Sequence, residues 1–138
     1  VEFPQPQGIT INMMPFIYGD NNTIPEEYQH YIPMIEKCNV HESHVGEICY
    51  LSITESLVKA GESHRRCGIH TERRMGMSWG GDGWGGYGPQ DGIYMASNVD
   101  KSCRLWDTKI EDPGLEGACE EPNLDPIYLK KNEFRFTC

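Results

Sequence analysis

Residues 61–98 read GESHRRCGIHTERRMGMSWGGDGWGGYGPQDGIYMASN and place histidines and an acid directly before a glycine-rich run. His70 and Glu72 are two positions apart, so on an extended strand both side chains would point to the same face. Eight glycines follow between Gly76 and Gly92, together with aromatic residues. Such a run has too little side chain to form a core and is typical of a backbone-mobile loop. The stretch therefore predicts a polar strand beneath an aromatic loop, arranged as the floor and lid of a site.

The segments on either side of this stretch have the character of short strands. Residues 45–58, VGEICYLSITESLV, are β-branched and alternating, and Ile48, Tyr50 and Leu51 are expected to point inward. Further strands are predicted at 92–97, 103–107, 127–129 and 132–138, with an acidic surface loop at 111–126. Strands at this spacing, without an internal repeat, favour a mainly β fold of antiparallel sandwich or barrel type.

Residues 1–44 are predicted to form a proline-rich, extended N-terminal arm. The arm alternates briefly at residues 9–11, and Pro25 followed by two acids predicts a helical turn that ends near Ile35. We therefore expect one domain over residues 1–138, with the arm at 1–44 and the β sandwich at 45–138. Since the chain begins at Val1 without a signal peptide, we also expect it to be processed, trimmed or part of a longer protein.

Composition excludes several classes of partner. A length of 138 residues suits one domain. No apolar run approaches the roughly 20 residues of a membrane span. The formal charge of −9 would repel phosphate backbones, which argues against nucleic acid. The expected partners are a small-molecule or glycan ligand, or a protein within an assembly.

The cysteines and a sequon point to an oxidising compartment, such as that of a secreted protein. The six cysteines are even in number and include no Cys-x-x-Cys pair, so three disulfides with open connectivity are expected. These cysteines are Cys38, Cys49, Cys67, Cys103, Cys119 and Cys138. Asn21 begins the sequence Asn-Asn-Thr in a turn-like setting, which predicts N-glycosylation of a glycoprotein.

A His-x-Glu pair on a strand suits a mononuclear iron, manganese or zinc site with open positions for substrate. On this element, residues 50–107 resemble the double-stranded β-helix proteins, the cupins and 2-oxoglutarate-dependent oxygenases. The resemblance implies a jelly-roll fold in which His70 and Glu72 bind a divalent metal. His64 matches no fixed position of those families but lies near enough in sequence to be a third candidate ligand. The distal histidine that those families use is absent, because no histidine follows His70.

The remaining residues of the stretch are candidates for ligand binding. Flat aromatic rings beside a carboxylate can stack on a sugar and accept hydrogen bonds, and arginines can pair with a ligand carboxylate. The candidates are Trp79, Asp82, Trp84, Tyr87, Arg66 and Arg73. Alternatively, the rings pack onto the sheet and the arginines balance neighbouring acids.

A second group, Cys38, His41 and His44, has ligand-type residues at three-residue spacing and could bind zinc with Cys49. The alternative is a pair of solvated histidines near a disulfide. No nucleophile elbow or phosphate-binding loop is present in the sequence. Two hypotheses follow: a cupin-like domain with a ligand or metal pocket, or an exported, disulfide-stabilised binding or structural module. The second would bind carbohydrate or serve as a subunit of a larger assembly.

Overall fold

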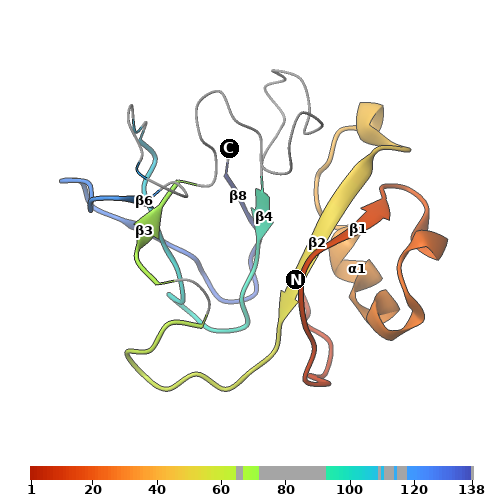
Figure 1. Ribbon diagram of the computed structural model, residues 1–138, viewed down its shortest axis with the longest axis horizontal. Coiled ribbons are helices and arrows are strands. Elements are labelled where there is room, and N and C mark those ends of the chain that lie inside the picture. Colours follow the sequence, from red (N-terminus) through yellow and green to blue (C-terminus); the bar gives the residue numbers. More distant parts are fainter. Residues whose placement is uncertain (65–66, 72–92, 109, 111–113, 115–117, 138) are drawn as a thin grey trace. The chain divides into compact units, whose positions relative to one another are not determined.

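The computed structural model describes residues 1–64, 67–71, 93–108, 110, 114 and 118–137. The chain divides into two compact units, Val1–Arg66 and Cys67–Cys138, and each is described by itself below. In the described residues, antiparallel strands predominate over short helices (Figure 1). The predicted mainly β, antiparallel character is therefore confirmed.

The first unit is built on one two-stranded antiparallel sheet. Strand β1 (Thr10–Ile17) pairs along most of its length with β2 (Ile48–Thr54). The strand predicted at residues 9–11 is thus longer than expected and supplies the pairing partner of β2. Pro15 lies within β1, where it is tolerated because β1 is an edge strand of this sheet.

A β-bulge sets which side chains of β1 face inward. The register shifts by one residue between Ile11 and Met14, so Asn12 and Met13 together oppose Ser52. Met13 adopts a left-handed φ of 58°, and its N–H donates to the Ser52 hydroxyl at 2.9 Å. The extra residue lets Ile11 and Met14 share one face despite their odd spacing.

Short helices connect the two strands. They are η1 (Asn21–Thr23), η2 (Glu26–Tyr31), α1 (Ile32–Ile35) and η3 (Glu42–His44). Pro25 is the residue before η2, and α1 ends at Ile35, as the sequence predicted. Ile35, the last residue of α1, and Phe16 of β1 line the same small cavity, so the end of α1 lies near the sheet.

The buried side chains of the first unit come from the sheet and from the helical segment. They are Phe16, Ile24, Tyr31, Met34 and Ile53, of which Ile24 is the most buried at 1% exposure. The inner face of the sheet therefore carries Phe16 from β1 and Ile53 from β2.

The prediction that Ile48 and Tyr50 point inward is wrong, because their side chains are 63% and 37% exposed. Strand β2 is apolar on both faces, so alternation alone does not decide which face is covered. The helical segment covers the face that carries Leu51 and Ile53, and Leu51 is half-buried as expected.

The described residues of the second unit form three pairs of short antiparallel strands. They are β3 (Ile69–His70) with β6 (Ala118–Cys119), β4 (Ile93–Met95) with β8 (Arg135–Thr137), and β5 (Arg104–Leu105) with β7 (Ile127–Tyr128). Tyr94 on β4 contacts the rings of Phe134 and Phe136, with centroids 6.3 and 4.9 Å away. Leu129 is 4% exposed and donates its backbone N–H to the Cys103 carbonyl.

None of the helices in the described part of the chain is long and apolar enough to cross a membrane.

Candidate functional site

The His-x-Glu pair lies partly outside the described residues. His70 is half-buried at the end of β3, where its backbone pairs with Ala118. Strand β3 ends at His70, and Glu72 is not among the described residues. Their common face therefore stays a prediction. The other predicted site residues that lie outside the described part are Arg66, Arg73, Trp79, Asp82, Trp84, Tyr87 and Cys138.

His64, the third candidate ligand, is an exposed residue of the first unit. Its Nε2 lies 2.8 Å from the Ser56 hydroxyl, so this nitrogen takes part in a local hydrogen bond. Within the described ranges, no group of three or more His, Cys, Asp or Glu side chains is placed to hold a metal ion. The described His, Cys, Asp and Glu residues alone therefore do not form a metal site. A site that combines His64, His70 and Glu72 stays a prediction.

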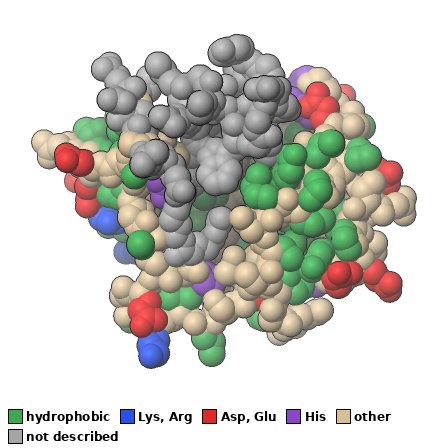
Figure 2. Space-filling model, in the orientation of Figure 1, with side chains coloured by type: hydrophobic (Ala, Val, Ile, Leu, Met, Phe, Trp, Pro, Cys, Tyr) green, Lys and Arg blue, Asp and Glu red, His purple; other side chains and the backbone are tan. Residues whose placement is uncertain are grey.

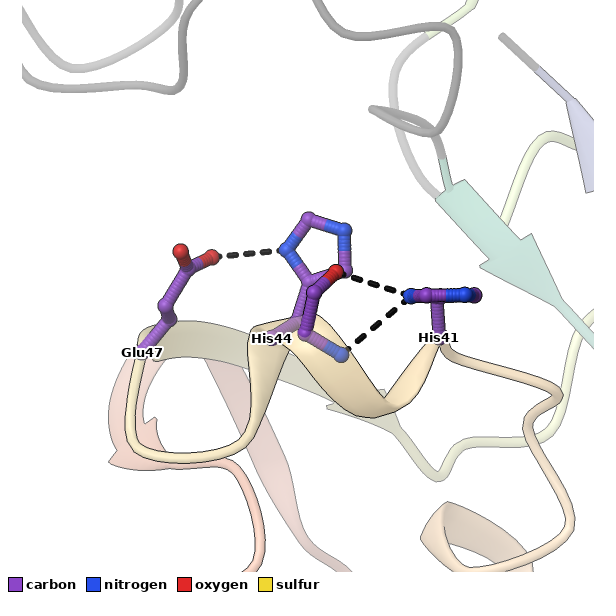
Figure 3. A network of polar contacts seen from close by, with 4 residues as sticks. His41, His44 and Glu47 are labelled. Atoms are coloured by element: carbon purple, nitrogen blue, oxygen red, sulfur yellow. Dashed lines mark hydrogen bonds and ion pairs between the residues drawn. The ribbon is translucent and has the colours of Figure 1, made fainter.

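The possible zinc site around η3 has a different arrangement in the structure. His41 Nδ1 accepts the backbone N–H of Ser43 at 3.2 Å and lies 2.8 Å from the Ser43 hydroxyl. His44 Nδ1 lies 2.7 Å from a carboxylate oxygen of Glu47 (Figure 3). The first imidazole caps the short helix and the second forms an exposed pair. The described residues from 38 to 49 are thus not gathered into a metal site.

Glu55, which follows β2, holds a polar cluster that the sequence analysis missed. Its carboxylate accepts the backbone N–H groups of Gln7 at 2.7 Å and Ile9 at 2.8 Å, and the hydroxyl of Tyr31. Gly8 lies between the two backbone donors with a φ of +79°, a conformation that suits glycine. The cluster joins the N-terminal segment, η2 and the end of β2. The hydrogen-bonded residues are 24 to 48 positions apart in the sequence, so no local sequence pattern indicates the cluster.

The cluster changes the acidity of both side chains. Partial burial raises the pKa of Glu55, but hydrogen bonds from Tyr31 and from the backbone of Ile9, Gln7 and Gly8 lower it, and the net pKa is below its usual value. Burial, together with the hydrogen bond to Glu55 and the negative charge on that carboxylate, raises the pKa of Tyr31. At neutral pH Glu55 is therefore an anion that accepts several bonds, and its role is structural.

The outer face of the β1–β2 sheet exposes large apolar side chains. Ile17 pairs with Ile48, and these side chains are 38% and 63% exposed. Tyr50, opposite Pro15, lies on the same face, and Val45 just before β2 is 60% exposed. Figure 2 shows hydrophobic side chains gathered over this part of the molecule. We call Ile17, Ile48 and Tyr50 the apolar face.

A small cavity and several acids lie around Val45, which precedes β2 in the chain. The cavity measures about 230 Å³ and is lined by Phe16, Tyr18, Gly19, Asn21, Ile35, Glu36 and Val45. Gly19 has a φ of +87°, and a Cβ added there would lie 3.0 Å from Val45 Cγ1. Val45 therefore packs closely on a turn that requires glycine. Three exposed acids lie near Val45. Glu36 lines the same cavity, and Glu42 and Glu47 are close to Val45 in the sequence.

The predicted modification sites are partly placed. Asn21 is exposed at the start of η1, and its amide donates to Glu36 at 3.0 Å. Its glycosylation stays a prediction. The described cysteines carry thiols: Cys38, Cys49, Cys67, Cys103 and Cys119. The predicted disulfides are therefore not formed among these five residues in the structure.

Comparison of the chain with models of known protein families, with curated proteins and with solved structures found no match. The resemblance to the double-stranded β-helix proteins therefore stays a prediction that depends on His70 and Glu72.

Proposed function

We propose that the chain is a binding module that docks a protein partner on the apolar face, as a subunit of a larger assembly. The observation that carries this proposal is the exposure of Ile17, Ile48 and Tyr50 on one side of two paired strands. Contiguous exposed apolar side chains bordered by polar residues are typical of protein interaction sites.

The charges around the apolar face favour a particular kind of partner. Glu36, Glu42 and Glu47 are exposed near Val45, and the whole chain carries a formal charge of −9. A second copy of the chain would bring like charges together. The partner is therefore a different protein whose apolar contact surface is bordered by lysine and arginine, because complementary charges favour association.

The described polar residues of the first unit support binding rather than catalysis. His41 caps η3, His44 pairs with Glu47, and Glu55 accepts bonds from three other groups. These side chains are engaged in holding the local structure. Ile17 and Ile48, by contrast, are apolar side chains that are 38% and 63% exposed.

A photo-cross-linking residue at position 48 tests the proposal. Ile48 is 63% exposed, so p-benzoylphenylalanine in its place is expected to leave the fold intact. The full chain is produced in its source cells and irradiated, and the cross-linked protein is identified and then purified separately. Its affinity for the full chain is measured by titration calorimetry at low and high salt.

Matched glutamate variants decide the outcome. Ile48→Glu should weaken binding by at least about tenfold, because the interface would have to bury a charge. Leu57→Glu makes the same change at a residue that is 104% exposed and outside the sheet, and should alter the affinity by less than about twofold. Equal binding by the two variants, or cross-linking only between copies of the chain, rejects the proposal.

Metal or ligand binding near His70 is a second candidate function, in a jelly-roll arrangement of the cupin type. It is favoured by the position of His70, half-buried on a paired strand immediately before the segment that carries Glu72 and the aromatic residues. The test is the content of iron, manganese and zinc in the purified chain, with His70→Ala and His41→Ala compared. About one equivalent of metal that is lost only in His70→Ala supports this function. Metal-free wild-type protein rejects it.

A further inference from the structure

The first unit contains two cysteines, Cys38 and Cys49, which come from the two elements that enclose its core. Cys49 lies on β2 opposite Phe16, a side chain only 8% exposed, and therefore on the inner face of the sheet. Cys38 follows α1, and its Sγ lies 3.7 Å from the carbonyl oxygen of Met34, another core residue. Both thiols are half-buried.

A shared cavity places the end of α1 near the part of the sheet where Cys49 lies. Phe16, the cross-strand partner of Cys49, and Ile35, the last residue of α1, line the same small cavity. Burial, and then the charge of a Cys49 thiolate, raise the pKa of Cys38 to about 11. An electrostatic effect of this kind weakens as the distance between the two sulfurs grows.

The size of the core gives a physical reason for a cross-link. Among residues 1–64, five hydrophobic side chains are buried, of which only Ile24 is fully buried: Phe16, Ile24, Tyr31, Met34 and Ile53. Compact units of this length bury little apolar surface, and small natural domains commonly add disulfides or metals to remain folded. The described residues of this unit do not provide a metal site.

We propose that Cys38 and Cys49 form a disulfide that fastens the end of α1 to the inner face of the β1–β2 sheet. This pairing goes beyond the proposed binding function and does not depend on it. It also reduces the number of possible disulfide pairings, because the remaining four cysteines all belong to the second unit.

The oxidation requires a disulfide oxidant of low molecular mass, such as oxidised glutathione. One cysteine thiolate attacks the oxidant, forms a mixed disulfide and releases one glutathione thiolate. The second cysteine thiolate then attacks the protein sulfur of the mixed disulfide, so that the Cys38–Cys49 bond forms and a second glutathione thiolate leaves. Two protein thiols lose two electrons and two protons, and the oxidant becomes two thiols.

Burial also raises the pKa of Cys49, with a further contribution from the charge of Glu47. Both groups are therefore protonated thiols at neutral pH, and few thiolates are available in the folded chain. Oxidation of the folded, reduced chain should accelerate as the pH rises from 7 towards 9. Oxidation during refolding should be faster at the same pH, because unfolding removes the burial.

Peptide mapping of the full chain tests the pairing directly. The chain is refolded with oxidised and reduced glutathione, blocked with iodoacetamide and cut with trypsin and a glutamate-specific protease. Cleavage after Lys37, Glu42, Glu47 and Glu55 separates the two cysteines. The expected product is one mass that joins residues 38–42 to residues 48–55, and reduction should split it. Cys67→Ser should retain this product, and Cys49→Ser should lose it.

Thermal unfolding provides a second measurement. The oxidised wild type should melt roughly 10 °C above its reduced form, as expected for a disulfide in a small unit. The double variant Cys38→Ser, Cys49→Ser should show no such difference for the first unit. The proposal is overturned if either cysteine is joined to another one, or if both remain alkylated thiols after oxidation.

Discussion

The two units of the chain use antiparallel pairing in different ways. In Val1–Arg66, strands of eight and seven residues pair along most of their length and help to enclose five buried side chains. In the described part of Cys67–Cys138, the paired strands are two or three residues long and Leu129 is the buried hydrophobic residue. The described part of the second unit thus has shorter strand pairs and fewer buried side chains than the first unit.

The two units also differ in whether their potential ligand residues take part in structural hydrogen bonds. In the first unit, the histidines and the acid that could act as ligands, His41, His44 and Glu55, form hydrogen bonds within the unit. The apolar face of the same unit is exposed. In the second unit, His70 lies on a short strand at the start of the segment that the sequence analysis singled out. The predictions below test this contrast.

The largest effect is expected at the centre of the first core. Ile24 is 1% exposed, so Ile24→Ala should leave a cavity and lower the free energy of unfolding by about 3 kcal/mol. Hydrogen exchange followed by mass spectrometry should show faster exchange in the peptides of β1 and β2. Val45→Ala, at a 60% exposed position, is the matched control and should cost less than about 1 kcal/mol.

The same experiment asks whether the chain unfolds as one domain. If Ile24→Ala affects β5 and β7 as much as β1 and β2, the chain behaves as the single cooperative domain that the sequence predicted. If the effect is confined to residues 1–64, the two units unfold separately.

A smaller effect is expected at the Glu55 cluster. Glu55→Gln removes the charge that accepts bonds from Gln7, Ile9 and Tyr31, and should lower the free energy of unfolding by about 1 kcal/mol, since the site is partly solvated. The pKa of Glu55 is lower in the folded state than in the unfolded chain. The carboxylate therefore stabilises the fold above about pH 4.3, and this stabilisation is lost as the pH falls through the folded-state pKa.

Urea unfolding between pH 3 and pH 7 measures this dependence. The difference between wild type and Glu55→Gln should be full near pH 6 and should shrink towards pH 3. Glu62→Gln changes an exposed acid in the same unit and should follow the wild type throughout. A constant difference at all pH values would show that the ionised carboxylate is not responsible.

The sequence predicted the position of β2 well, because β-branched residues alternate along it. It did not predict the buried face, since Ile48 and Tyr50 on one side are as apolar as Leu51 and Ile53 on the other. Only the packing of the helical segment separates the two faces. Alternation therefore located the strand, and tertiary contacts oriented it.

The length of β1 and the Glu55 cluster could not be predicted, for two physical reasons. Pro15 and the bulge at Met13 interrupt the alternation that identifies a strand, although an edge strand tolerates both. The bonds of Glu55 join residues far apart in the sequence. Of the candidate site, His70 was correctly expected on a strand, and the geometry at Glu72 stays a prediction.

The smallest effect is expected at η3. His44→Gln removes an exposed pair with Glu47 and should change the free energy of unfolding by no more than about 0.5 kcal/mol. Added zinc should leave the melting temperature of the reduced wild type unchanged, because the described residues 38–49 form no metal site. A rise in melting temperature that disappears in His44→Gln would restore the zinc hypothesis.

Hydroxyl-radical footprinting at Tyr50 tests directly whether the apolar face binds a protein partner. The rate of Tyr50 oxidation is measured in the chain alone and in the chain isolated with its bound proteins. Tyr128, 44% exposed in the second unit, serves as the internal reference. Oxidation of Tyr50 should fall several-fold in the assembly, while that of Tyr128 should be unchanged. Equal oxidation of Tyr50 in both preparations would contradict binding at this face.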